Sequence, residues 1–293
     1  MGRLIVNADD FGLTRGVNRA VAELHAMGAL TSATLMAQGD AADEAIALAL
    51  QTLSLGVGCH VVLVDGVPRL PPQDIPHLAD PVSGRFRSTL WEFLRAAHSH
   101  GPWANVSPID SAIEAETAAQ IARLQARGLR LTHIDTHKHT HMFPAVLRPV
   151  LRAARAAGIR TVRNPFEPAW SRRATPRSAL LRRAQLNLLH RLEPAFRRIV
   201  AEEGFTTTNG SLGVLATGQL DASLIAAFLR DLPAGTWELV THPGYNDTDL
   251  DQVRTRLRGS RQVERQALQS IQPRPGLELI GFAQHSPQGN PPQ

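Results

Sequence analysis

Short apolar runs of strand length recur along the chain, and between them lie longer segments whose apolar positions repeat at helical spacing. The strand-like runs are 4–7, 30–36, 56–63, 131–135, 159–163, 204–207, 238–241 and 277–282. The helix-like segments are 16–27, 40–52, 110–127, 144–157, 177–202, 219–231 and 255–270. This alternation predicts parallel strands joined by helical crossovers. Seven or eight such units in 293 residues favour an α/β fold, a single (β/α) barrel, regular or distorted, over an open doubly wound sheet.

Acidic and histidine side chains fall at or just beyond the C-terminal ends of the predicted strands, the rim on which barrels carry their catalytic groups. They are Asp9, Asp10, His60, Asp135, His137 and His242. Asp9 and Asp10 are adjacent, and two ionised carboxylates at the end of a buried strand repel each other, for which a shared cation is the usual remedy. Aspartate and histidine suit a divalent ion, and three protein ligands leave positions for water and substrate. The pattern predicts a catalytic metal site.

The segment 135–141 is the strongest of these signals, because aspartate and three histidines alternate there directly after a β-branched strand. In extended geometry His137, His139 and His141 would share one face, but they cannot all reach one ion. We therefore expect one of them to bind the metal, while the others, together with Asp135, orient the ligands or contact substrate.

Two other residues at predicted strand ends indicate different roles. His242 precedes a Pro-Gly turn, and a titratable imidazole on the rim is a candidate general acid. Cys59 is next to His60 but on the other side of an extended strand, so we expect a buried core thiol rather than a ligand or nucleophile. As the single cysteine of the chain, it excludes an internal disulfide and is typical of a reducing compartment.

The net charge of +5 comes from arginine, since Lys138 is the one lysine. Arginines concentrate between Arg172 and Arg198, where they interleave with leucines at helical spacing. This region is either a solvated helix face or a docking site for anionic lipid headgroups or another acidic partner. Nucleic acid is disfavoured, because aromatic residues make up 5% of the chain and no nucleic-acid motif accompanies the arginines.

Domain organisation follows from the same patterns. We expect one catalytic domain over 1–283 and a disordered tail over 284–293, which has nothing to bury. The Pro- and Gly-rich excursion 64–108 either covers the site or is a surface insertion. The chain opens on a strand, with no leader-like segment and no apolar stretch near twenty residues, which predicts a cytoplasmic protein.

Several segments together resemble one enzyme family. They are 7–12 (NADDFG), 30–36 (LTSATLM), 58–60 (GCH), 133–144 (HIDTHKHTHMFP) and 242–245 (HPGY). In order and over nearly the whole chain they resemble the YdjC family of carbohydrate deacetylases, which includes chitooligosaccharide deacetylase. The segments 56–66, 217–220 and 244–247 look closer still to the hopanoid-biosynthesis branch, linked to deacetylation of an N-acetylglucosaminyl hopanoid lipid.

The resemblance implies a distorted (β/α) barrel and assigns roles to the rim residues. Asp10, His60 and His137 would hold one divalent metal ion, Asp9 would be the general base, and His242 the acid. Mg²⁺ and Zn²⁺ both suit this ligand set. The implied reaction is hydrolysis of the acetamide of an N-acetylglucosamine-type sugar, with release of acetate.

The substrate would be an N-acetylated sugar or a hopanoid-linked glycolipid. With a lipid-linked substrate, the region 172–198 could hold the enzyme at the inner face of a membrane, and a homodimer is also compatible. Arg163 would hold a sugar hydroxyl or orient a catalytic carboxylate, with a plain surface arginine as the alternative. Two departures from the family are Lys138, where histidine or glutamine is frequent, and 208–213, where an Asp-His-Phe type segment is common.

Two other functions remain open at this stage. A metal-dependent phosphoesterase or other amidohydrolase could use clustered histidine and aspartate on a similar barrel, although such sites commonly hold two metals and begin with His-x-His near the first strand. This chain begins with Asp-Asp instead. The second is a non-catalytic sugar- or lipid-binding subunit that retains a structural ion.

Overall fold

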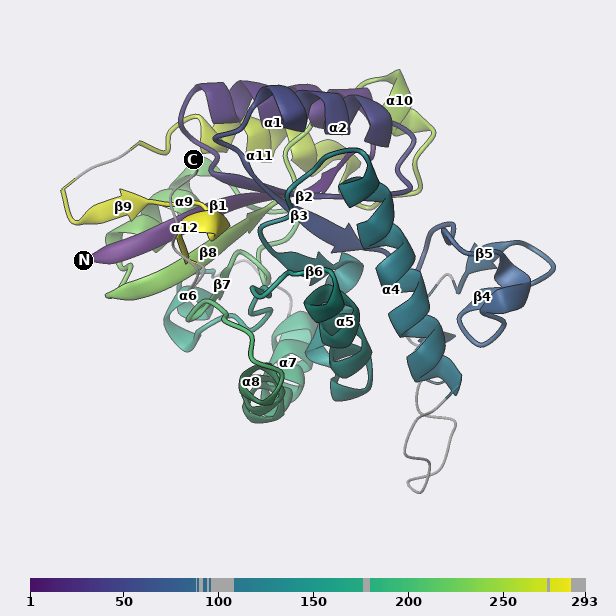
Figure 1. Cartoon of the computed structure of the whole chain (residues 1–293). Coiled ribbons are helices and arrows are strands. Elements are labelled where there is room, and N and C mark those ends of the chain that lie inside the picture. Colours follow the sequence, from purple (N-terminus) through teal and green to yellow (C-terminus); the bar gives the residue numbers. More distant parts are fainter. Residues whose placement is uncertain are drawn as a thin grey trace.

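A curled parallel β-sheet forms the centre of the computed structural model, which describes residues 1–87, 89, 92–93, 95, 108–175, 180–272 and 275–285 (Figure 1). Its strands are β1 (Gly2–Phe11), β2 (Ser32–Leu35), β3 (Gly56–Val61), β6 (Ile134–Thr136), β7 (Gly210–Leu212), β8 (Gly235–Thr241) and β9 (Leu277–Leu279). Six of them follow one another in the order β6-β3-β2-β1-β8-β7, and β9 pairs with β1. Because all of these pairings are parallel, the C-terminal ends of the strands lie along one edge.

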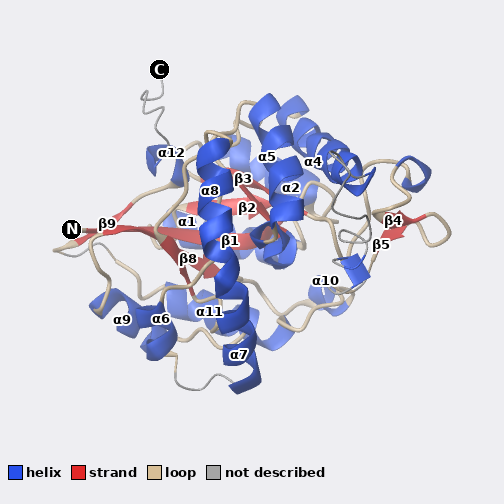
Figure 2. Cartoon of the chain, turned by 90° about the horizontal axis from the view of Figure 1, so that it is seen from below, coloured by secondary structure: helices blue, strands red, loops and turns tan. Residues whose placement is uncertain are grey.

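Helices cover the outside of this sheet, with α1, α2 and α11 along one side and α5 and α8 along the other (Figures 1 and 2). The bounds are α1 (Arg15–Ala26), α2 (Ala42–Gln51), α4 (Pro108–Ala126), α5 (Pro144–Ala156), α6 (Ala169–Ala174), α7 (Leu180–Leu189), α8 (Glu193–Glu202), α9 (Ala222–Arg230), α10 (Thr248–Asp251), α11 (Arg258–Leu268) and α12 (Phe282–His285). Three short 3-10 turns are η1 (Pro72–Asp74), η2 (His137–Met142) and η3 (His190–Leu192).

The local sequence explains where helix α1 begins and which of its faces is buried. The Thr14 side chain accepts a hydrogen bond from the Val17 amide and caps the N-terminus. Val17, Val21 and Leu24 repeat at helical spacing and are buried against the sheet.

Strand β1 is the longest strand and places the first candidate residues. From Leu4 to Phe11 it is buried throughout, as expected for a parallel strand covered on both faces. Its pairing with β2 shifts register between Ala8 and Phe11. Such a bulge re-aims side chains, and it falls at Asp9 and Asp10.

The parallel α/β fold is therefore confirmed, whereas two predicted strands form only isolated bridges. Segment 159–163 pairs through Val162 with Ile134, and segment 204–207 pairs through Thr206 with Thr161. Just beyond these bridges, the Asn164 side-chain amide donates to the Thr208 carbonyl and its oxygen accepts from the Phe166 amide. Strand β7, at 210–212, was not predicted.

Two further segments differ from the sequence-based expectation. The helix expected over 177–202 is divided into α7, η3 and α8, with Pro194 in the first turn of α8. The excursion 64–108 contains η1 and a hairpin of β4 (Ala79–Asp80) and β5 (Arg85–Phe86), while its two tryptophans lie outside the described residues.

The tail expected over 284–293 includes two residues that the structure places in a helix. Gln284 and His285 belong to α12, where the Gln284 side chain accepts from the Gly281 amide at 2.6 Å and Phe282 is fully buried. Residues 286–293 lie outside the described part of the chain. None of the helices within the described ranges is long and apolar enough to cross a bilayer.

Candidate functional site

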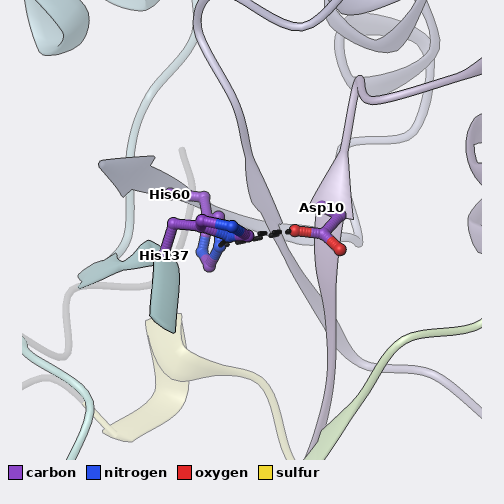
Figure 3. A group of neighbouring side chains, drawn as sticks. All are labelled: Asp10, His60 and His137. Carbon is purple, nitrogen blue, oxygen red and sulfur yellow. Dashed lines mark hydrogen bonds and ion pairs between the residues drawn. The ribbon is translucent and has the colours of Figure 1, made fainter. Parts of the chain in front are cut away.

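Three residues far apart in the sequence converge at the C-terminal edge of the sheet (Figure 3). Asp10 comes from β1, His60 from β3, and His137 is the first residue after β6. Asp10 Oδ1 lies 3.6 Å from His60 Nε2 and 3.5 Å from His137 Nδ1, and the two nitrogens are 3.3 Å apart. The structure thus brings together the three predicted metal ligands.

The Asp10 carboxylate is held with one oxygen free. Its backbone is left-handed, with φ of 63°, a strained conformation for a residue other than glycine. Arg261 donates to Oδ2 at 2.5 Å, whereas the buried Oδ1 has no hydrogen-bond partner among the described residues and faces the two imidazoles. Burial raises the pKa of Asp10, but Arg261 and His137 outweigh it, so the pKa lies well below its usual range.

His60 is oriented by a second carboxylate. Its Nδ1 lies 2.8 Å from Asp135 Oδ1, which fixes the ring so that Nε2 faces Asp10. A carboxylate behind the distal nitrogen is typical of histidines that bind metal. Burial lowers the pKa of His60, but Asp135 and the two neighbouring aspartates raise it to about 9. Asp135 thus has the orienting position that the sequence predicted.

These donor atoms fit one divalent ion. A tetrahedral ion with bonds of about 2.0–2.1 Å separates its ligands by roughly 3.3–3.4 Å, close to the observed separations. The unpartnered Asp10 Oδ1 is the kind of buried acceptor that a cation would satisfy. Asp9, His60 and Asp135 also lie within metal-binding range of one another, but Arg163 already binds the two carboxylates.

Both oxygens of the Asp9 carboxylate bind a buried arginine. Arg163 donates to Asp9 Oδ2 at 2.8 Å and to Oδ1 at 2.5 Å, and Asn7 adds a bond to Oδ1 at 3.0 Å. Burial raises the pKa of Asp9, but Arg163 and His60 lower it far below its ordinary value. Asp9 is therefore ionised at any pH near neutrality.

Arg163 has no solvent exposure, so the alternative of a surface arginine is wrong. Besides Asp9 it binds Asp135, and its Nε donates to Glu238 Oε1 at 2.8 Å. One guanidinium thus binds three buried carboxylates around the site, an arrangement suited to the orienting role that was one of the two expected for it.

His242 follows β8 and lies beside Asp9. Its Nε2 is 3.8 Å from Asp9 Oδ2, and its Nδ1 is 3.8 Å from Glu264 Oε2. The backbone amide of His242 donates to the same Glu264 oxygen at 2.7 Å. With a side-chain exposure of 12%, the ring can reach a bound substrate.

The other histidines of segment 135–141 do not share a face with His137, because the segment is not extended. Lys138 and His139 adopt left-handed backbone angles inside η2. His141 is buried and bonds Thr136 Oγ1 at 2.8 Å and the Arg163 carbonyl at 3.2 Å, so it braces the strand ends. His139 Nδ1 is buried without a hydrogen-bond partner. Lys138 binds Asp65 at 2.8 Å.

Sequence reasoning missed three charged residues of the site: Glu238, Arg261 and Glu264. All three are buried. Glu238 stands within an otherwise apolar strand, which is a usable signal of a buried partner. Arg261 and Glu264 lie three positions apart on a strongly polar helix, where the sequence indicates an exposed pair.

Among the proteins similar to the chain are two that are named as deacetylases. It is 44% identical over 152 residues to a carbohydrate deacetylase of Brevibacillus brevis, a match covering 52% of this chain and 55% of the relative. It is 37% identical over 158 residues to a chitooligosaccharide deacetylase of Salmonella paratyphi B, covering 53% of this chain and 57% of the relative. The matches thus span a little over half the length of these relatives.

A solved structure and a family model each match more of the chain than these relatives do. A solved structure from Enterococcus faecalis V583, of a protein named for cellobiose-phosphate cleavage, superposes with a TM-score of 0.73 over 97% of this chain and 99% of that chain, at 23% identity. The family model described as YdjC-like protein matches residues 3–278. The chain therefore belongs to the YdjC-like family.

Proposed function

We propose that the protein is a metal-dependent N-deacetylase that removes acetate from an N-acetylglucosamine-type sugar. The observation that carries this proposal is the approach of Asp10 Oδ1, His60 Nε2 and His137 Nδ1 to within 3.3–3.6 Å of one another beside Asp9 and His242. The names of the matching relatives support the same chemistry.

The residues around the ligands divide the work of amide hydrolysis. An ion held by Asp10, His60 and His137 would polarise the acetyl carbonyl and acidify a water molecule. Asp9, held ionised by Arg163, accepts the proton of the attacking water. His242, which lies beside Asp9, donates a proton to the departing amine.

Finer features of the proposal follow from the site and the family resemblance. The two imidazole ligands favour Zn²⁺ over Mg²⁺, which prefers oxygen ligands and water. We also propose a hopanoid-linked substrate, one catalytic domain extending through α12, and a sheet that closes as a distorted seven- or eight-stranded barrel through the bridges at Val162 and Thr206.

A membrane contact is proposed for helix α7. Leu180, Leu181 and Leu188 are 85%, 71% and 61% exposed, and α7 buries no residue. Arg182 ties α7 to the loop after β7 through the carbonyls of 214 and 217, so these leucines lie near the C-terminal edge that carries the site. An apolar and arginine-rich helix beside the site suits a lipid-linked sugar.

Two substitutions test the reaction and the assignment of the aspartates. Asp9→Asn is expected to retain bound metal and lose acetate release, whereas His137→Ala loses both. The reason is that His137 is one of the three proposed ligands and Asp9 is not. The exposed Asp43→Asn is the matched control and keeps both. The measurements are metal content by elemental analysis and acetate release from diacetylchitobiose and from N-acetylglucosaminyl hopanoid.

Two outcomes would count against the proposal. Equal metal loss in Asp9→Asn and His137→Ala would show that Asp9 is a ligand. Phosphate release from a sugar phosphate, without acetate release from either N-acetyl substrate, would make the protein a phosphoesterase.

A further inference from the structure

Helix α11 carries two charged residues that are buried where a surface helix normally has apolar ones. Arg261 and Glu264 are each 1% exposed and lie three positions apart, on one face of the helix. Arg261 binds Asp10, while Glu264 lies against His242. Burying a carboxylate is unfavourable unless it is satisfied, so Glu264 requires a physical explanation.

Glu264 is only partly satisfied by its described neighbours. Its Oε2 accepts from the His242 backbone amide at 2.7 Å, the Gly218 backbone amide also lies beside the carboxylate, and Oε1 is buried without a hydrogen bond of standard geometry to a described residue. His242 Nδ1 is also buried without a partner, 3.8 Å from Glu264 Oε2. An unpaired ring nitrogen and an unpaired carboxylate oxygen therefore lie on adjoining side chains, and hydrogen bonds of catalytic groups are often long before substrate binds.

We infer that Glu264 is a positioning residue for the proposed deacetylation: it holds the His242 ring with Nδ1–H toward α11, so that Nε2 is the nitrogen that gives its proton to the leaving amine. This inference rests on the proposed function. The proton balance is simple, because Nε2–H of the imidazolium is transferred to the amine, and the neutral ring keeps its remaining proton on Nδ1, facing Glu264.

The surroundings of the ring support this orientation. Asp9 on β1 faces Nε2 at 3.8 Å, and Glu264 on α11 faces Nδ1 at the same distance. Burial raises the pKa of Glu264, while His242 and Arg261, its charged neighbour on the same helix, act in the opposite direction. A carboxylate on the distal nitrogen stabilises the imidazolium and selects one tautomer of the neutral ring.

The variant Glu264→Gln keeps the size of the side chain and an acceptor for the His242 amide but removes the charge. We expect kcat to fall by about 10–100-fold with KM and metal content unchanged. The alkaline limb of the kcat profile should move to lower pH, because an imidazolium without its carboxylate loses its proton more easily. Glu264→Asp, which restores the charge, should return the limb toward the wild-type position.

Glu167→Gln is the matched control. Glu167 is also a buried glutamate that accepts from backbone amides, those of Gly213 and Leu215, but it does not lie against His242. It should lose stability to a similar degree and leave the alkaline limb in place. A limb that moves equally in both variants would reduce Glu264 to a structural role.

A second measurement does not depend on turnover. Nitrogen NMR of histidine-labelled protein, with the His242 signal assigned by His242→Asn, reads the tautomer directly. The wild type should carry the neutral proton on Nδ1, and Glu264→Gln should shift it toward Nε2. An unchanged tautomer and titration midpoint would overturn the inference, whereas absence of acetate release by the wild type would overturn only the proposed function.

Discussion

Asp9 and Asp10 are neighbours in the sequence, yet their carboxylates have different partners. Arg163 binds both oxygens of Asp9, whereas Arg261 binds one oxygen of Asp10 and leaves the other facing two imidazoles. Each aspartate therefore has its own buried arginine. The sequence suggested that a shared cation relieves the repulsion between the two carboxylates, whereas in the structure the two arginines also relieve it. The bulge in β1 and the left-handed backbone at Asp10 make this separation possible.

At the scale of single residues, we predict that Arg163 is critical for folding as well as for turnover. Arg163→Met leaves Asp9, Asp135 and Glu238 buried without their cation, and it should lower the free energy of unfolding by about 3–5 kcal/mol. Arg163→Lys keeps the charge but not the planar fork, so it should lie between Arg163→Met and wild type.

Urea unfolding followed by circular dichroism measures these differences. Arg198→Lys is the control, because Arg198 is 69% exposed and should change stability by less than about 0.5 kcal/mol. Full stability and turnover in Arg163→Lys would contradict the argument, since it would show that a point charge suffices.

At the scale of elements, apolar periodicity predicted most of the strands and helices, but not the partners of the site. The spacing of apolar residues predicted helix α11. In the sequence, however, Arg261 and Glu264 look like an exposed i, i+3 pair. Their burial depends on Asp10 and His242, which pairing of β1 with β8 brings together. Likewise, 159–163 has strand composition but pairs only through isolated bridges, and the next residue, Asn164, bonds the Thr208 carbonyl and the Phe166 amide through its side chain.

Helix α7 gives the prediction at this scale. Wild-type protein should sediment with vesicles containing anionic lipid at low salt and less so at high salt, because arginines are screened while leucines are not. Leu181→Asp combined with Leu188→Asp should reduce binding, whereas Leu53→Asp should not, since Leu53 is 89% exposed but precedes β3, at the opposite edge of the sheet. Equal sedimentation of all three proteins, or none by wild type at low salt, would exclude α7 as the contact.

At the scale of the whole molecule, the parallel sheet is what makes the ligands predictable. Residues at the C-terminal ends of parallel strands meet along one edge, so the sequence was sufficient to predict that Asp10, His60 and His137 converge. It was not sufficient to identify Arg261 as the partner of Asp10, because no local pattern links two residues 251 positions apart. The family resemblance supplied the roles, while the structure supplied the charges that support them.

The pH dependence of stability is also a property of the whole fold. Burial lowers the pKa of His133 to about 3 and of His141 to about 4, although Asp135 opposes this. An unfolded histidine titrates near 6.5, so between that pH and about 4 the unfolded chain binds more protons and both rings make stability fall as pH falls. Glu238, whose pKa burial raises to about 7, acts in the opposite sense between pH 7 and about 4.5, so the wild-type slope is a balance.

A substitution isolates one ring from that balance. His133 stacks on Phe282 at 3.7 Å, and His133→Phe keeps a ring there that cannot take a proton. Between pH 6.5 and 4 its stability should fall less steeply than that of wild type, by one proton or about 1.4 kcal/mol per pH unit. Urea midpoints of metal-free protein at several pH values measure both slopes, and His133→Gln serves if the larger ring is not accommodated. Parallel slopes for wild type and both variants would mean that His133 is protonated in the folded state, and that burial against Phe282 does not keep its ring neutral.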